Sequence, residues 1–272
     1  MIVRSLQLTD FRNYSSLQLE LGAGVHALIG DNAQGKTNLV EALVVLSTMK
    51  SFRGVTNDAA VRKGATSAFI RADIVHDDDR EFLVEIEFKS AGRSVAQVNR
   101  KRIVRTRDLL GVLRTTVFMP DDRNLVHGGA SERRALLDDA VVAVEPSRLD
   151  LVSELERVVR QRNALLKDAG YRPSSAVLAA LDAWDEKLAA LGDEVGAARA
   201  ALLAEMTPFV QSSYAALAGE AREVSLTYSA DWRVGGLASA LADSRENDLR
   251  RGTTTVGPHR DDVVVQLDDF AS

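Results

Sequence analysis

The sequence contains no cysteine, few aromatic residues and no long apolar run. Without cysteine the chain can form neither disulfides nor thiolate metal sites, which suits a reducing compartment. No stretch approaches the roughly 18 consecutive apolar residues of a transmembrane helix. The histidines His26, His76, His127 and His259 are scattered without zinc-ligand spacing. These absences favour a cytoplasmic protein without membrane contact, and they give no support to a zinc site.

The overall composition is that of a globular protein. With 272 residues and 46% hydrophobic composition, the chain is long enough for one large domain or two. Its first residues, MIVRSLQLTDF, read as an amphipathic strand. They show no charged segment followed by an apolar core, so they do not resemble a signal peptide.

A glycine-rich turn of the form G-x-x-x-x-G-K-[ST] follows an early apolar run. Glycines allow the tight turn in which backbone N–H groups surround a phosphate, and the next helix adds its unpaired N–H groups. The lysine would reach the β- and γ-phosphates, and the threonine hydroxyl would bind Mg²⁺. The pattern predicts a site for ATP and Mg²⁺. Its residues are Gly30, Asp31, Asn32, Ala33, Gln34, Gly35, Lys36 and Thr37, with Thr37 as the metal ligand.

The flanks of this turn strengthen the prediction. VHALI, residues 25–29, reads as a short strand, and KTNLVEALVVLSTM, residues 36–49, has helical spacing. Leu39, Leu43 and Leu46 would share one face of that helix. A strand, a glycine turn and a helix in this order are the context in which the motif binds phosphate.

The net charge of −5 hides a basic segment between Lys89 and Arg114. It carries eight basic residues against one acid, Asp108, for a local charge of +7. Such a segment on an acidic protein is typical of a surface that contacts the nucleic-acid backbone. A solvated face whose charges pair with acids elsewhere is the alternative. The candidate DNA-binding residues are Arg93, Arg100, Lys101, Arg102, Arg105 and Arg107.

The secondary-structure pattern divides the chain into three zones. Residues 1–129 combine strands with the phosphate-loop helix, and SVAQVNRKRIV predicts a hairpin that bends at Asn99-Arg100. Residues 130–222 are helical, and residues 223–272 return to strands around a charged helix. This layout predicts an α/β fold: an ABC-type, SMC-like P-loop ATPase head with a helical second lobe.

Four segments resemble conserved blocks of one family. They are LQLTDFRNY (6–14), FMPDDRNLVHGGASERRALLD (118–138), VVRQRNALLK (158–167) and TTTVGPHRDD (253–262). In this order they are similar to the RecF family of bacterial DNA replication and repair proteins. Two positions depart from the family pattern, since Ala130 stands where proline is usual and Leu136 where an aromatic residue is usual.

The resemblance implies an ATP-dependent DNA-binding protein of recombinational repair and replication restart. Members bind duplex DNA and single-strand/duplex junctions, dimerise with ATP, work with RecO and RecR, and aid recombinase loading at gaps. They have a weak DNA-stimulated ATPase. In related heads the turn after the first strand lies near the nucleotide, so Arg12 and Asn13 are candidate nucleotide contacts, with a surface turn as the alternative.

Two late elements of such heads are not found in complete form. These are a serine-glycine signature helix and a hydrophobic strand that ends in paired acids. VVVQL followed by Asp268-Asp269 could be that strand, but a loop after an ordinary strand is the favoured interpretation. We therefore also consider a fragment that binds ATP without turnover. A phosphotransferase acting on a small molecule is a further alternative, although it explains neither the helical zone nor the basic segment.

Overall fold

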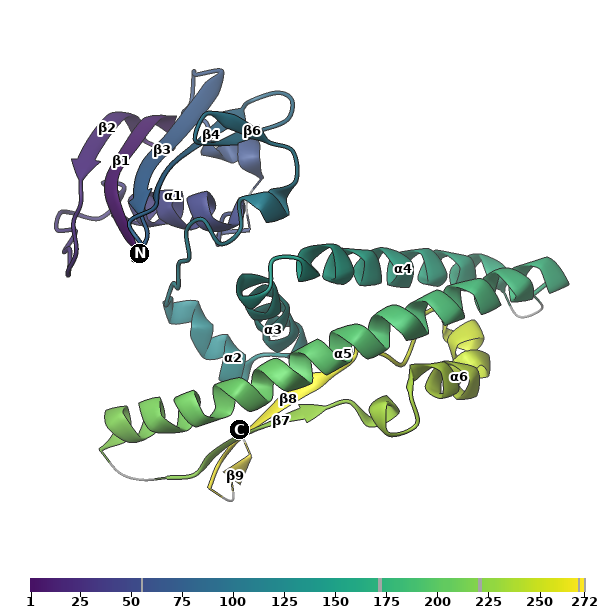
Figure 1. Ribbon diagram of the computed structural model, residues 1–272. Helices are drawn as coiled ribbons and strands as arrows, with labels where there is room; N and C mark the ends of the chain where they lie inside the picture. Colours follow the sequence, from purple (N-terminus) through teal and green to yellow (C-terminus); the bar gives the residue numbers. More distant parts are fainter. Residues whose placement is uncertain (55, 171–172, 220–221, 269, 272) are drawn as a thin grey trace. The chain divides into compact units, whose positions relative to one another are not determined.

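The computed structural model describes residues 1–54, 56–170, 173–219, 222–268 and 270–271. The chain folds into two compact units, Met1–Phe118 and Met119–Ser272 (Figure 1). Each unit has its own core, so the two are described separately.

The first unit is an antiparallel sheet with one long helix. Its strands follow the order β2-β1-β3-β4-β5-β6. Their bounds are β1 Ile2–Phe11, β2 Tyr14–Glu20, β3 Ser67–Val75, β4 Glu81–Lys89, β5 Val95–Val98 and β6 Lys101–Ile103. Helix α1 is Lys36–Thr48, and the short 3-10 turns are η1 Asn57–Ala60 and η2 Thr106–Asp108.

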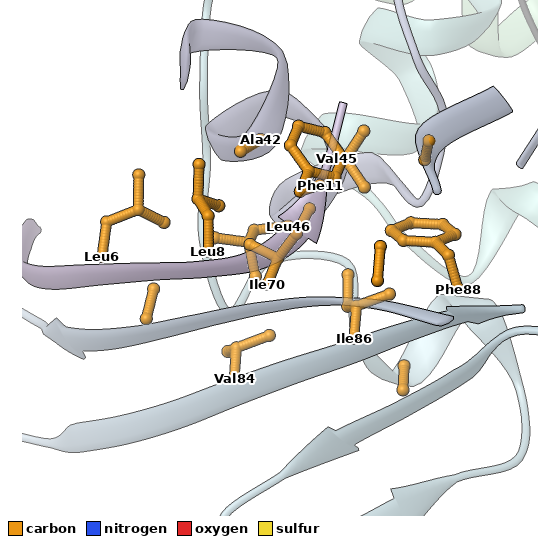
Figure 2. Close-up of a cluster of buried hydrophobic side chains, with 14 of the residues drawn as sticks. Leu6, Leu8, Phe11, Ala42, Val45, Leu46, Ile70, Val84, Ile86 and Phe88 are labelled. Atoms are coloured by element: carbon orange, nitrogen blue, oxygen red, sulfur yellow. The ribbon is translucent and has the colours of Figure 1, made fainter. Parts of the chain in front are cut away.

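The core of this unit lies between α1 and one face of the sheet. Alternate residues of a strand point to opposite faces, so SAFIRADIV buries every second side chain. Figure 2 shows Leu6, Leu8 and Ile70 from the strands beside Ala42 and Leu46 from α1. The predicted helix with its apolar face is confirmed. Its leucines pack as expected, with Leu39 and Leu46 buried and Leu43 partly buried against the same core.

The predicted strand at Val25–Ile29 is wrong. These residues belong to no strand, and Val25 and Ile29 are 101% and 93% exposed. An apolar run becomes a strand only when a neighbouring chain segment pairs with its backbone. Among the described residues this segment pairs with no strand of the six-stranded sheet, whose edges are β2 and β6.

The second unit combines long helices with a small antiparallel sheet of order β7-β8-β9. Its helices are α2 Asn124–His127, α3 Ala130–Val144, α4 Arg148–Ala169, α5 Ser175–Ala218 and α6 Leu237–Arg251. Its strands are β7 Val224–Ser229, β8 Asp262–Leu267 and β9 Phe270–Ala271, and its 3-10 turns are η3 Pro120–Arg123 and η4 Asp231–Val234. No helix in the described part of the chain is long and apolar enough to cross a membrane.

Helix α5 organises this unit. Ser174 caps its start by accepting a hydrogen bond from the Val177 backbone N–H at 3.3 Å. Two glycines one turn apart allow close packing against it. A Cβ atom at Gly192 would lie 2.2 Å from Leu237, and one at Gly196 would lie 2.8 Å from the Trp232 ring.

The compact units divide the chain earlier than the sequence pattern does. The first unit ends at Phe118, ahead of the predicted boundary after residue 129. Strands β7 and β8 pair with each other and pack on helices α5 and α3, within the second unit. The three-zone division of the chain therefore stays a prediction.

Candidate nucleotide site

The phosphate-loop motif forms an exposed turn between β2 and α1. Gly30 and Gly35 have φ angles of 153° and 101°, which residues with a Cβ atom rarely adopt. Gly35 is the N-cap residue of α1 and provides no side-chain cap. A helix start of this kind offers backbone N–H groups and the positive end of the helix dipole to an anion. The geometry fits the phosphates of a nucleotide.

Lys36 and Thr37 stand at the first two positions of α1. The Lys36 ammonium donates to the carbonyl oxygens of Gly30 and Asp31, both at 2.7 Å, so it lies across the loop. Thr37 follows with an exposed side chain. The chemistry of this pair fits a phosphate and a hard cation, since an ammonium pairs with phosphate oxygens and a hydroxyl is a ligand that Mg²⁺ accepts.

Two residues of the β1–β2 hairpin, Asn13 in its turn and Tyr14 at the start of β2, contact the phosphate loop. The side-chain amide of Asn13 donates to the carbonyl of Gln34 at 3.1 Å, and the Tyr14 hydroxyl donates to the carbonyl of Gly35 at 3.2 Å. A Cβ atom at position 35 would lie 2.6 Å from both polar atoms of the Asn13 amide. Backbone conformation therefore favours glycine at position 35, and a Cβ atom there would also displace the Asn13 amide.

Arg12 is bound to other protein groups. Its Nε donates to Glu41 at 3.0 Å and its Nη1 donates to the carbonyl of Ala59 at 2.6 Å. Its backbone φ is 56°, a conformation that this tight turn requires. Asn13 is thus the member of the pair that touches the loop, and direct contact of either residue with a nucleotide stays a prediction.

Sequence reasoning missed three residues next to the loop. Glu41 is buried on α1, Asn38 lies on the same helix, and Arg53 donates to Asn38 at 2.8 Å. The one sign of these residues in the sequence is Glu41. An acid among the apolar positions of a helix is rarely buried without a partner of opposite charge.

The predicted β5–β6 hairpin is confirmed. Asn99 and Arg100 form its two-residue turn, with φ angles of 50° and 63°. Both values are positive, as in the turns that best match the twist of a hairpin. The Asn99 side-chain oxygen also accepts from the Leu83 backbone N–H at 2.8 Å, which fixes the turn against β4.

The candidate DNA-binding residues do not share one face. Arg102 pairs with Gln97 and lies on the face of the sheet that α1 leaves open. Its neighbour Lys101 lies on the same side as Ile103, which packs against the core. Arg93 in the β4–β5 loop lines a hollow of about 530 Å³ together with Lys89 at the end of β4. Of the remaining three, Arg100 lies in the β5–β6 turn, and Arg105 and Arg107 belong to the segment around η2.

Strand β6 is an edge of the sheet, which gives the basic residues a second explanation. Unpaired edges invite other chains to add a strand, and lysine or arginine on the edge opposes this. Exposure alone therefore does not separate a DNA-binding surface from a protected edge.

Two acidic positions near family motifs have local contacts. Asp122 caps the short turn η3 by accepting from the Met119 backbone N–H at 2.7 Å. Asp268 lies in the turn between β8 and β9, with a φ of 52°, and accepts from the Glu223 backbone N–H at 3.0 Å. A role of Asp268 in metal binding stays the less favoured alternative to a loop after an ordinary strand, and Asp269 lies outside the described residues.

The GPHRDD motif connects elements of the second unit. Asp261 is buried and accepts from the Trp232 indole at 2.6 Å and the Tyr228 hydroxyl at 2.5 Å. Arg133 donates to Asp262 at 2.7 Å. Burial, together with nearby arginines, lowers the pKa of His259 to about 4, so its ring is neutral at pH 7. These contacts explain the motif through packing in the second unit.

The chain is similar to known proteins over most of its length. Residues 5–126 match a family model described as an AAA domain. The chain is 40% identical to the DNA replication and repair protein RecF of Streptomyces avermitilis, over 98% of this chain and 75% of that protein. It is 39% identical to the RecF protein of Frankia alni, over 97% of this chain and 74% of that protein.

Solved structures agree with the sequence relatives. A structure of the recombination mediator protein RecF-ATPrS in the RecFOR pathway has a TM-score of 0.92 and 27% identity, over 99% of this chain and 74% of that chain. The Smc head domain of Pyrococcus furiosus, bound to the C-terminal domain of ScpA, shares the fold alone. Its TM-score is 0.50 at 15% identity, over 98% of this chain and 72% of that chain.

The fold and the phosphate loop together define a P-loop ATPase head of the ABC type, with the mixed α/β architecture that SMC heads share. The expected fold class is confirmed. Within that class, the chain belongs to the RecF family.

Proposed function

We propose that this chain binds ATP at the Gly30–Thr37 loop and uses it to control binding to duplex DNA in recombinational repair and replication restart. The observation that carries the proposal is the phosphate loop. An uncapped helix start, two glycines at positive φ and the Lys36 ammonium converge on one exposed turn.

Each group at the loop has a definable task. The N–H groups at the start of α1 and the Lys36 ammonium would hold the phosphates, and the Thr37 hydroxyl would be one ligand of Mg²⁺. The bound triphosphate would supply a charge-rich group that a second protein surface can recognise. Because binding energy at a shared nucleotide shifts a monomer–dimer population, an ATP-dependent homodimer is the expected form.

The DNA-binding surface belongs to the proposal as well. The candidates are the exposed basic residues Arg93, Arg100, Lys101, Arg102 and Arg105, together with Arg107. Few aromatic residues lie among them in the sequence, so contact with the phosphate backbone of duplex DNA or of single-strand/duplex junctions is favoured over stacking on bases. The RecF family relation supports RecO and RecR as partners and aid to recombinase loading at gaps. A weak DNA-stimulated ATPase is the expectation for the family, whereas for this chain we expect ATP binding without turnover. The family relation gives no support to a small-molecule phosphotransferase.

The test of the nucleotide site is the substitution Lys36→Ala. Loss of the ammonium leaves phosphate charge unpaired in the loop, which costs a few kcal/mol for a charge-assisted contact. Equilibrium titration with ATP should show at least about tenfold weaker binding. Unchanged affinity in a folded variant would overturn the assignment.

A further inference from the structure

The buried carboxylate of Glu41 contacts several polar side chains near the phosphate loop. The residue is 1% exposed. It accepts hydrogen bonds from Arg12, at 3.0 Å from Nε and also from Nη2, and from the Ser51 hydroxyl. The Arg53 guanidinium lies 3.4 Å from it. A buried carboxylate needs such partners, because its desolvation otherwise costs several kcal/mol.

These interactions join three separate segments to α1. Arg12 belongs to the β1–β2 turn, and Ser51 and Arg53 follow the end of α1. Arg12 also binds η1, since its backbone N–H donates to the Ala60 carbonyl at 2.8 Å. The helix that begins at the phosphate loop is thereby fixed to the turn that holds the other side of that loop.

Two routes connect Glu41 to the loop backbone. In the first, Glu41 holds Arg12, and the next residue in the chain is Asn13. In the second, Arg53 donates to the Asn38 side-chain oxygen at 2.8 Å, and the Asn38 amide donates to the Asn13 side-chain oxygen at 2.8 Å. Both routes end at Asn13, whose amide donates to the Gln34 carbonyl at 3.1 Å.

We propose that Glu41 is a positioning residue for the phosphate loop, acting through Asn13, so that its charge sets nucleotide affinity without touching the nucleotide. The inference rests on the proposed ATP binding at Gly30–Thr37. Its physical basis is preorganisation. A loop held in its binding conformation loses less entropy on binding, and a loop that populates that conformation only part of the time binds more weakly by the same fraction.

The substitution Glu41→Gln keeps the shape of the side chain and removes its charge. The glutamine NH₂ would also face the guanidinium of Arg12, a donor against donors. Arg12 and Arg53 would lose their shared anchor. We expect nucleotide affinity to fall about tenfold, with the fold retained.

Glu85 provides a matched control in the same unit. It accepts from the Arg71 Nε at 2.9 Å on the open face of the sheet, and its register partners are on β3 and β5. Glu85→Gln makes the same chemical change to an arginine-paired carboxylate, on the face of the sheet that points away from α1. It should leave nucleotide affinity unchanged.

The measurement is equilibrium titration with a fluorescent ATP analogue, below the unfolding midpoint of each variant as checked by circular dichroism. Asn38→Ala cuts the second route without removing a buried charge, so it serves if Glu41→Gln does not fold. It should weaken binding by about threefold. Glu41→Asp keeps the charge and should restore part of the affinity that Glu41→Gln removes.

A double-mutant cycle separates positioning from general loss of structure. If Glu41 acts through Asn13, the variant with both Glu41→Gln and Asn13→Ala should bind no more weakly than the weaker single variant. Additive losses, or a folded Glu41→Gln protein with wild-type affinity, would overturn the inference. If the wild-type chain binds no more tightly than Lys36→Ala, the proposed nucleotide site itself fails, and this outcome is distinct from the others.

Discussion

Gly35 and Asn13 fit together without room for a methyl group. The two polar atoms of the Asn13 amide would each lie 2.6 Å from a Cβ atom at position 35, and the same amide binds the Gln34 carbonyl. The β1–β2 turn therefore packs against the phosphate loop. The Asn13 side chain occupies the space that a Cβ atom at Gly35, the second glycine of the motif, would take.

The first prediction concerns Gly35→Ala. The φ of 101° strains any residue with a Cβ, and the contact with Asn13 adds a steric clash. ATP affinity, measured by titration, should fall at least about tenfold because the loop must shift.

Gly92→Ala is the matched control for that change. Its φ of 106° is similar, but nothing in the described part of the chain lies within 4 Å of the added Cβ atom. It should cost about 1 kcal/mol of stability in chemical unfolding and leave ATP affinity unchanged. Equal effects of the two variants on affinity would show that the Asn13 contact is unimportant.

The second prediction concerns the β5–β6 hairpin. Replacing Arg100, Lys101 and Arg102 with alanine should weaken duplex DNA binding about equally for unrelated sequences. The log–log salt dependence should flatten by roughly one for each DNA phosphate that the variant no longer neutralises.

Single variants and a control refine this test. Arg102 and Lys101 lie on opposite faces, so Arg102→Ala and Lys101→Ala should differ if one face meets the DNA. Arg80→Ala removes an exposed arginine that pairs with Asp78, and it should have no effect on the salt slope. A triple variant that stays folded, keeps the wild-type slope and aggregates more readily would identify the basic residues as edge protection.

The third prediction is that the chain binds ATP without measurable turnover. Hydrolysis requires a carboxylate that holds Mg²⁺ and orients water, and a partner residue that closes the site. Asp268, the acid that the sequence leaves open for this role, occupies a turn where it accepts from the Glu223 N–H and lies 3.7 Å from Arg222.

Phosphate release is measured beside nucleotide binding, with duplex DNA added, and Lys36→Ala sets the background. Release at background level with intact binding is the expected result. Release above background that Asp268→Asn abolishes would show that Asp268 is a working acid.

The fourth prediction concerns His259 and pH. Its folded-state pKa of about 4 lies below the usual 6.5, so the neutral ring stabilises the fold fully above pH 6.5. This stability should decrease as the pH falls from 6.5 towards 4, because over that range the unfolded chain binds a proton on His259 that the folded chain does not bind. Each tenfold difference in proton affinity between the folded and unfolded chain corresponds to about 1.4 kcal/mol. His259→Gln keeps a donor for the Thr254 carbonyl, which the ring contacts at 3.1 Å, and does not titrate.

The measurement is the free energy of unfolding across that pH range. The difference between wild type and His259→Gln should change with pH, whereas His127→Gln, at an exposed position, should follow the wild type. Parallel curves for wild type and His259→Gln would mean that the ring titrates normally.

Local patterns in the sequence determined the phosphate loop, helix α1, the β5–β6 hairpin and the long helices of the second unit. A glycine at positive φ, a capping serine at position 174 and helical spacing of leucines act within a few residues of themselves. The order of the RecF blocks also placed the chain in its family before any contact was known.

Only the tertiary structure decided where these local features meet. VHALI has the composition of a strand, but strand formation depends on a partner elsewhere in the chain. Nothing near Glu41 in the sequence identifies Arg12 as its partner. Adjacent residues of a strand alternate between its faces, but the pairing of β6 with β5 decides that Arg102, and not Lys101, lies on the open face. Pairing, register and the burial of charge arise from contacts between distant residues, so a pattern read along the chain does not contain them.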